Sequence, residues 1–303
     1  MTYDPPDSAE STNAEPLAPG LYLVATPIGN LEDITLRALR ILRSADKIAC
    51  EDTRQTQKLL NHYSIRTPTI SYHMHNEAGR ATELAVALKA GARIAVVSDA
   101  GTPGIADPGG QIAAAAIAAG IPVFPVPGAN AAISALIASG LAGTGDGESF
   151  TFHGFLPAKE GQRRTALEGL LANHTPGTQI FYEAPHRILD TLADVAAIFG
   201  PAQHVVVARE LTKLHEEFLR GAVSEVRKTL ADRASVRGEI VLLFAPAPAD
   251  ASTGQKPKSI AAEVRELMKT QGLDEKDALK QVARARNIGK SEAYRELQRE
   301  RGK

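Results

Sequence analysis

Several residue types and sequence features are scarce in this chain, and each absence excludes a class of protein. Cys50 is the single cysteine among 303 residues, so an internal disulfide is excluded and a cysteine-based zinc site is not expected. Tryptophan is absent and aromatic residues make up 5%, so the core volume must come from Ala, Leu, Ile and Val. No apolar run approaches the roughly 20 residues of a membrane span. An ordinary globular protein without membrane segments remains.

The first 20 residues lack what a secretory signal needs. They contain four acidic residues, four prolines and no Lys or Arg. A secretory signal requires a cationic start and an apolar stretch, and neither is present. We therefore expect residues 1–20 to form a solvated, disordered leader, and the protein to be cytoplasmic.

The net charge of −1 hides an asymmetry between the body and the tail of the chain. Residues 256–303 hold 13 Lys and Arg against 8 Asp and Glu, whereas the remainder holds 21 against 27. A cationic tail on an acidic body suggests a polyanionic partner for the tail. A merely solvated helical surface explains the same pattern equally well.

Residues 21–140 alternate short apolar strands with helical patterns. Strands are expected at 21–25, 47–50, 69–73, 93–98 and 121–126, and helices at 77–90, 111–119 and 129–139. Nearly continuous apolar strands that alternate with helices predict an α/β domain with a mostly parallel sheet covered on both faces.

A second α/β domain is expected over 150–245, after a Gly- and Ser-rich linker at 141–149. Several of its strands are joined without room for a crossover helix, so its sheet should be mixed or antiparallel. A Pro- and Ala-rich linker at 245–258 leads to three helical patterns over 259–301. These have the cadence of a helix-turn-helix, although a small helical cap fits nearly as well.

Three Gly- and Pro-rich turns follow predicted strands of the first domain, at 26–30, 98–109 and 127–130. Ligands of an open parallel sheet bind outside the carboxyl ends of its strands, where these turns would meet. The chain has no Gly-Lys-Ser/Thr phosphate loop, and no Gly-x-Gly-x-x-Gly follows the first strand. We therefore expect a nucleoside-like ligand without phosphates. The alternative is that these Gly and Pro residues only form turns between strands and helices.

Five segments together resemble the tetrapyrrole methylase superfamily. They are VATPIGN (24–30), EDTR (51–54), VSDAGTP (97–103), FYEAPHR (181–187) and ARELTK (208–213). More narrowly, they resemble its bacterial branch, the 16S ribosomal RNA cytidine-2′-O-methyltransferases. The resemblance runs from about residue 21 to residue 245.

The resemblance implies a homodimer in which two α/β domains enclose S-adenosylmethionine and act on 16S ribosomal RNA, within the 30S subunit. By position, the cofactor residues would be Pro27, Ser98, Asp99, Ala100, Gly101, Asn130, Ala131, Tyr182 and Leu211. Because this chain has Ser-Asp-Ala where the superfamily has Gly-Asp-Pro, either Pro103 or Ile105 completes the pocket.

Methyl transfer to a ribose hydroxyl is an in-line displacement at a sulfonium methyl, so alignment is the protein's main task and no metal is required. A base or a cation near the 2′-oxygen would help, although alignment alone can suffice. We favour Glu183 as base or orienter and Lys213 as the cation that lowers the pKa of the hydroxyl. The other candidates at strand ends are Glu51, Asp52, Arg54, Arg187, Arg209 and Glu210. Each of these can equally be part of a salt bridge that fixes a loop.

An aromatic residue and three cations follow one another between 155 and 164, a combination typical of RNA contact. Lys159, Arg163 and Arg164 are therefore expected to bind RNA from a loop, the alternative being a solvated charged loop. His73 and His75 could form a metal pair, but no third ligand is evident. His75 and Asn76 are more plausibly placed on the substrate side.

Two other functions remain compatible with the sequence. One is a methylase of the same fold that acts on a porphyrinoid or a similar small molecule. The other is a non-catalytic module that binds S-adenosylmethionine, or a nucleotide, and RNA. The basic tail favours RNA as the substrate, since an enzyme for a macrocycle would not need it.

Overall fold

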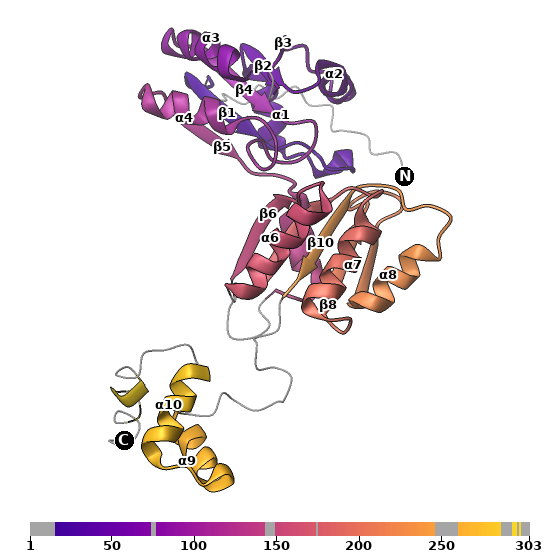
Figure 1. Cartoon of the computed structure of the whole chain (residues 1–303). Helices are drawn as coiled ribbons and strands as arrows, with labels where there is room; N and C mark the ends of the chain where they lie inside the picture. Colours follow the sequence, from indigo (N-terminus) through magenta and orange to yellow (C-terminus); the bar gives the residue numbers. More distant parts are fainter. Residues whose placement is uncertain are drawn as a thin grey trace. The chain divides into compact units, whose positions relative to one another are not determined.

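The computed structural model describes residues 16–73, 77–142, 149–173, 175–245, 260–285, 293–295 and 297 (Figure 1). Two compact units, Met1–Pro246 and Ala247–Lys303, divide the chain. The expected leader, except for residues 16–20, lies outside the described residues, as do most of the two expected linkers and the last break of the helical tail. No helix among the described residues is long and apolar enough to cross a membrane.

The first sheet is entirely parallel, as the alternation of strands and helices predicted. Its strand order is β3-β2-β4-β1-β5. The strands are β1 (Gly20–Val24), β2 (Lys47–Cys50), β3 (Thr69–Ser71), β4 (Arg93–Val97) and β5 (Val123–Val126). Since all five run the same way, the loops that follow them emerge at one edge, which is where a ligand of such a sheet is expected.

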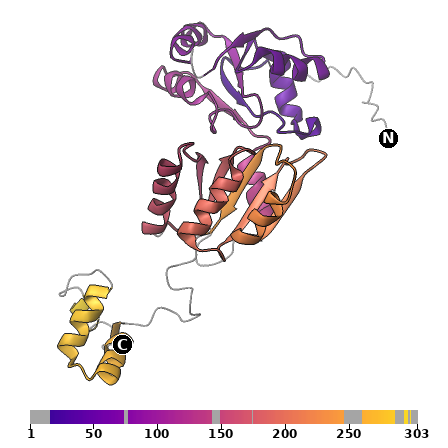
Figure 2. The ribbon, with the colours of Figure 1, turned by 45° about the vertical axis from the view of Figure 1, so that its right-hand side comes forward.

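Helices cover both faces of this sheet (Figures 1 and 2). On one face lie α1 (Leu36–Ser44) and α2 (Thr53–His62), packed on Tyr22 and Val24. On the other lie α3 (Glu77–Lys89) and α4 (Gly110–Ala118), packed on Leu21. Neighbouring residues of β1 enter opposite clusters because side chains alternate along a strand. Thr35 caps α1 and Asp52 caps α2, each accepting a backbone N–H of the first turn.

The second sheet is mixed, as its short connections predicted. Its order is β6-β7-β10-β8-β9, with β6 and β7 parallel and the remaining pairs antiparallel. The strands are β6 (Phe150–Phe155), β7 (Thr178–Glu183), β8 (His204–Arg209), β9 (Glu217–Ala222) and β10 (Ile240–Phe244). The predicted fold class, two α/β sheets of which the second is mixed, is confirmed.

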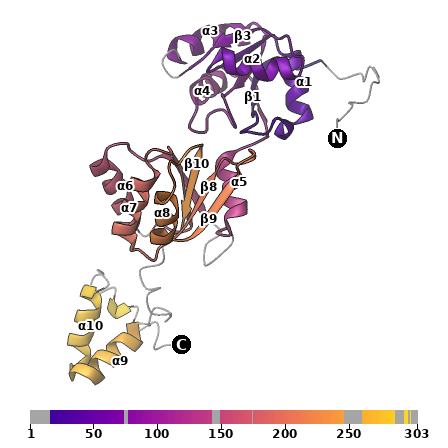
Figure 3. The same ribbon diagram turned by 90° about the vertical axis from the view of Figure 1, so that its right-hand side faces the viewer.

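Helices also cover both faces of the second sheet, and one of them comes from the sequence assigned to the first domain. The helices α6 (Glu160–Ala172), α7 (Ile188–Phe199) and α8 (Val223–Ala231) lie on one face (Figure 3). The other face is covered by α5 (Ala131–Ser139), whose Ala135 and Leu136 pack against Val206 and Leu243. The sequence grouped 129–139 with the first sheet. The helix packs on the second instead, because β5 is an edge strand and no further strand follows it in its own sheet.

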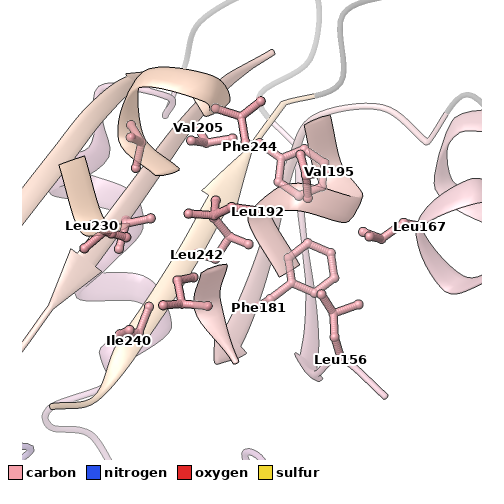
Figure 4. Packing of buried hydrophobic residues seen from close by; sticks show 14 residues of the cluster. Leu156, Leu167, Phe181, Leu192, Val195, Val205, Leu230, Ile240, Leu242 and Phe244 are labelled. Carbon is pink, nitrogen blue, oxygen red and sulfur yellow. The ribbon is translucent and has the colours of Figure 1, made fainter. Parts of the chain in front are cut away.

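The core of the second sheet is centred on β10, which is buried along its whole length. Leu242 and Phe244 of β10 meet Phe181 of β7 and Leu192 of α7 in one apolar cluster (Figure 4). In the second unit, the helices α9 (Ile260–Gln271) and α10 (Glu275–Ala285) form a small cluster of their own that includes Val264 and Val282. The tail is therefore helical where it is described.

Replacing Leu242 by Ala tests this core. The side chain is fully buried in the central strand, so we expect the free energy of unfolding to fall by about 2–5 kcal/mol. Urea denaturation, followed by the helical signal, measures the change. Leu214→Ala is the matched control, because Leu214 is 93% exposed and its loss should cost less than about 0.5 kcal/mol. Equal losses in the two variants would contradict this description of the core.

Candidate functional site

A cavity of about 400 Å³ lies at the edge where the loops of the first sheet emerge. One wall comes from the loops of the first sheet, chiefly residues 99–102 and 105–107 after β4 and Asn130 and Ala131 after β5. The other wall comes from the second sheet, through Tyr182 of β7, Leu211, and residues 238–241 at the start of β10. Its volume is in the range of pockets that hold small molecules.

Most of the residues predicted to contact a cofactor line this cavity. They are Asp99, Ala100, Gly101, Ile105, Asn130, Ala131, Tyr182 and Leu211. Pro27 is not among the lining residues; its neighbour Ile28 is. Ser98 lies beneath the lining, with its hydroxyl 3.3 Å from the carbonyl oxygen of Ala100. Of the two residues left open by the sequence, Ile105 lines the cavity and Pro103 does not.

Backbone hydrogen bonds join the three turns that form the first wall. Thr26 and Gly101 exchange two of them, at 2.8 and 3.1 Å, and the Thr102 hydroxyl donates to the carbonyl of Ala129 at 3.1 Å. Gly101 has a φ of +81°, a conformation that a side chain would strain, and a Cβ there would lie 3.3 Å from Ile28. The glycine therefore allows the first two turns to approach each other closely.

Three carboxyl groups from the loops of the first sheet line the cavity. They belong to Glu51, Asp99 and Asp107. Burial raises the pKa of Asp107 to about 6, and the charges of Glu51 and Asp99 add to this effect. Burial and the charge of Asp99 likewise raise the pKa of Glu51. The lining residues are all in the described part of the chain, and none of them is Lys, Arg or His. The cavity therefore favours a cationic ligand and disfavours an anionic one.

Glu183, predicted as base or orienter, is among the residues that line the cavity, and the surroundings of its carboxylate favour the second role. Its side chain has no exposed surface, and its carboxylate accepts hydrogen bonds from the Ala184 amide at 2.7 Å and the Thr191 hydroxyl at 2.6 Å. Arg187 lies 3.1 Å away and donates to the carbonyl of Leu156 at 2.7 Å. A base must reach the proton that it removes, and this carboxylate is enclosed. Glu183 and Arg187 fix the turn that borders the cavity.

Lys213 is bound between two carboxylates and is not among the lining residues. Its ammonium donates to Glu210 at 2.9 Å and to Glu239 at 3.0 Å. Burial opposes the charged form, yet the two carboxylates raise the pKa of Lys213, so it stays protonated. The stem of Lys213 lies against Gly29, where a Cβ would collide with it. Next to this contact, the backbone N–H of Asn30 donates a hydrogen bond to the Thr212 hydroxyl at 3.1 Å. Lys213 thus holds Glu239, which lines the cavity, while its stem touches the first turn.

Asp52 and Arg54 pair with each other just outside the cavity. The Asp52 carboxylate caps α2 and accepts from the Arg54 side chain at 2.8 and 3.1 Å. These hydrogen bonds lower the pKa of Asp52 to about 2. The backbone N–H of Asp52 donates to the Asp99 carboxylate at 3.0 Å, which ties the start of α2 to the cavity. Arg54 is 88% exposed.

The expected RNA-binding loop is largely helical, and this corrects the prediction for Arg163. Lys159 is exposed at the N-cap of α6, whereas Arg163 and Arg164 lie within that helix. Arg163 is 4% exposed and bonded to Asp194 at 2.7 Å, so it cannot reach an RNA in this structure. Arg164, 3.4 Å from the same carboxylate, is partly exposed. His75 and Asn76 lie outside the described residues.

Sequence reasoning missed part of the lining. Asp107 stands in the Gly- and Pro-rich turn that had been singled out, and an acidic residue in such a turn was a usable signal. Residues 238–241 gave none, because they begin an antiparallel strand and reach the cavity only through pairing with β7 and β8. Among the described residues, no group of three or more His, Cys, Asp or Glu side chains is arranged to hold a metal ion.

Comparison with known proteins agrees with this fold. The family model of the Tetrapyrrole (Corrin/Porphyrin) Methylases matches residues 20–227. A ribosomal RNA small subunit methyltransferase I of Halalkalibacterium halodurans is 48% identical and covers 90% of this chain and 93% of its own. The protein of the same name from Bacillus subtilis is 44% identical, covering 90% and 92%.

Solved structures resemble the chain in fold alone. Uroporphyrin III C-methyl transferase from Thermus thermophilus has a TM-score of 0.52 at 17% identity and covers 74% of this chain and 96% of its own. A diphthine synthase has a TM-score of 0.57 at 14% identity, covering 74% and 89%. The two-sheet arrangement is therefore shared by proteins that differ widely in sequence.

The charge of Asp107 should destabilise the folded chain at neutral pH. Its pKa of about 6 exceeds the usual value of 3.8, so the native state binds the proton more tightly and stability falls as the pH rises from about 4 to 6. We expect Asp107→Asn to raise the free energy of unfolding at pH 7.5 by about 1 kcal/mol, since solvent screens most of the shift.

Urea denaturation across this pH range measures the effect, and the gain should shrink as the pH falls toward 4. The exposed Asp232 of α8 provides the control, because Asp232→Asn should leave the pH profile unchanged. A gain for Asp107→Asn that does not vary with pH would contradict the charge argument.

Proposed function

Because the chain belongs to the tetrapyrrole methylase family of S-adenosylmethionine-dependent methyltransferases, we propose that it methylates ribosomal RNA of the small subunit. Curated relatives at 43–48% identity are named for that activity. The finer proposal is transfer of the methyl group to the 2′-hydroxyl of a cytidine ribose in 16S ribosomal RNA. That part rests on the resemblance of the sequence motifs.

The observation that carries the cofactor assignment is the acidic cavity. S-adenosylmethionine has a positive sulfonium and a positive ammonium group, and Glu51, Asp99 and Asp107 would attract both. The apolar side chains of Ile105 and Leu211, with the ring of Tyr182, suit the adenosine part. A nucleoside triphosphate would meet carboxylates with no lining cation. The residues present therefore fit the sulfonium donor better than a phosphate-bearing ligand.

The proposed mechanism assigns most of the acceleration to alignment. When bound, the donor supplies an electrophilic methyl group with a neutral leaving group, so holding the ribose oxygen in line with it is the main requirement. The pair of Glu183 and Arg187 would orient the turn after β7, and Lys213 would position Glu239. Both predicted catalytic residues thus become positioning residues.

Asp107 is the carboxylate best suited to accept the proton of the 2′-hydroxyl. It faces the cavity, and its raised pKa makes it a stronger base than an ordinary aspartate while leaving it ionised at neutral pH. A cation beside Asp107 lowers that pKa, and loss of the cation raises it again. A bound sulfonium would therefore keep the pKa of Asp107 low, and once that charge was gone Asp107 would hold the proton taken from the hydroxyl more firmly.

The proposed partners are 16S ribosomal RNA in the 30S subunit and a second copy of the chain. Exposed apolar side chains support self-association: Ile133 and Ile137 on α5 are 42% and 74% exposed, and Phe150 on the edge strand β6 is 46% exposed. A ribosomal substrate also implies a cytoplasmic location.

Calorimetry tests the role of the acidic cavity. We expect the chain to bind S-adenosylmethionine, and Asp107→Asn to weaken this binding about tenfold, as removal of one close charge pair costs about 1.4 kcal/mol. The affinity for S-adenosylhomocysteine, whose sulfur is neutral, should fall less in this variant. Asp232→Asn serves again as the control. Equal losses for the two ligands would contradict the sulfonium assignment, and absence of any binding would refute the cofactor proposal.

Tritiated donor offered with 30S subunits, naked 16S RNA and uroporphyrinogen in parallel tests the substrate. We expect label in RNA, recovered after alkaline hydrolysis in a dinucleotide, because a 2′-O-methyl group blocks cleavage at its own position. Label in the macrocycle alone would replace the RNA proposal. Binding of donor and RNA with no label anywhere would make the chain a non-catalytic module.

A further inference from the structure

A second hollow, of about 430 Å³, lies along α2 and differs in charge from the acidic cavity. It is lined by Thr53, Arg54, Gln57, Lys58 and Asn61 of α2 and by Thr69 of β3. Each of these side chains can hydrogen-bond, two are cationic and none is a carboxylate. Arg, Lys, Thr, Asn and Gln are the side chains that contact phosphate and sugar oxygens of nucleic acids. We call this hollow the α2 groove.

The helix that lines the α2 groove and its neighbour α1 carry charged side chains of one sign. The two helices α1 and α2 pack on the same apolar cluster and lie together on one face of the first sheet (Figure 3). Neither contains Asp or Glu, and between them they bear Arg37, Arg40, Arg43, Arg54 and Lys58, all exposed. The net charge of the chain is −1, yet these two neighbouring helices carry only positive charge. Such clustering of positive charge is typical of a surface that binds a polyanion.

The two cations of the groove keep charge available for a ligand. Lys58 donates to the neutral amide oxygen of Gln55 at 2.8 Å, and this contact leaves the charge of its ammonium group unneutralised. Arg54 shares its charge with Asp52, yet its side chain is 88% exposed and the rest of its guanidinium faces solvent. Arginine can bind one acidic group and still donate to a phosphate, because its five N–H groups point in several directions.

The α2 groove begins where the acidic cavity ends. Glu51 lines the cavity, the backbone of Asp52 donates to Asp99 of the cavity, and Thr53 and Arg54 of the groove follow directly. From Thr53 to Asn61 the helix extends about 12 Å away from that edge. A strand lying along α2 would therefore lead into the cavity.

The acidic cavity cannot itself attract an RNA strand. Three carboxylates repel the phosphates that flank any target nucleotide, so the affinity for RNA must come from cations elsewhere. The loop expected to supply them contributes less than predicted, because Arg163 is buried in its ion pair with Asp194.

We propose that the α2 groove binds the sugar-phosphate backbone of the RNA strand whose target ribose enters the acidic cavity, with Arg54 and Lys58 as its phosphate contacts. The proposal rests on the proposed methylation of RNA, and it adds the surface that holds the substrate. Contacts of this kind fix the position of a strand without reading its bases.

The test compares Lys58→Gln and the double variant Arg54→Gln/Lys58→Gln with the unaltered chain in binding to naked 16S RNA over a range of salt concentrations. Each lost phosphate contact should reduce the slope of log affinity against log salt by about 0.7–0.9. We expect the double variant to bind about tenfold more weakly near 0.1 M salt and to show a slope smaller by about 1.4–1.8.

Two controls separate this proposal from folding and from the proposed function. Lys89→Gln removes an exposed cation from α3, on the opposite face of the sheet, and should leave affinity and slope unchanged. Affinity for S-adenosylmethionine should be the same in all variants, since none of the altered residues lines the acidic cavity.

An unchanged slope in the double variant, or an equal loss for Lys89→Gln, would overturn the proposal while leaving the proposed function intact. Competition by polyglutamate as effective as competition by RNA at matched charge would assign the groove to acidic proteins instead. Failure of the unaltered chain to bind both naked 16S RNA and 30S subunits would refute the proposed function itself.

Discussion

The placement of three carboxyl groups around one cavity is the constraint on which the chemistry of this protein depends. Glu51 follows β2, whereas Asp99 and Asp107 both lie in the loop after β4, and the common direction of the strands brings these two loops to one edge of the parallel sheet. No cation among the lining residues offsets them, although Arg187 and Lys213 neutralise other carboxylates nearby. Charge that the fold leaves uncompensated costs stability and is available to a ligand. A cationic ligand would recover that free energy on binding.

The rest of the site keeps these carboxylates in place. Ala106, next to Asp107, has a φ of +63°, and Glu210 and Thr212 beside Lys213 also have positive φ values, so backbone strain lies on both walls of the cavity. The contact of Lys213 with Gly29 fixes the strained stretch beside Lys213, and the Glu183 network fixes the neighbouring turn after β7. Ion pairs that resembled catalytic groups in the sequence therefore serve to hold the walls of the cavity rigid.

The sequence predicts those features that depend on strand direction and alternation, and misses those that depend on tertiary packing. Apolar strands separated by helices led to the parallel sheet and to the turns at its edge, whereas the family resemblance singled out Asp99, Gly101 and Asn130 within those turns. The segment around Arg163 was read as a loop because its charges stand together. No proline follows Pro157 there and Glu160 occupies the first helical turn, so the helix forms and places Arg163 inward. The burial of Glu183 and the position of β10 beside the cavity depend on the pairing of strands that are far apart in the sequence, which local patterns do not predict.

The negative charges line the cavity and the positive charges lie outside it on α2, and this separation affects how the site can work. A cavity that attracts a cation also stabilises it before reaction, and stabilisation of the ground state alone does not accelerate chemistry. With the sulfonium donor of the proposal, the positive charge disappears as the methyl group moves, and the carboxylates would oppose that step unless another positive charge took its place. A proton passing from the ribose to Asp107 is such a charge, so methyl transfer and proton transfer would compensate each other within the cavity. The cations of α2 are best placed outside it, because a cation among the three carboxylates would compete with the donor and lower the basicity of Asp107.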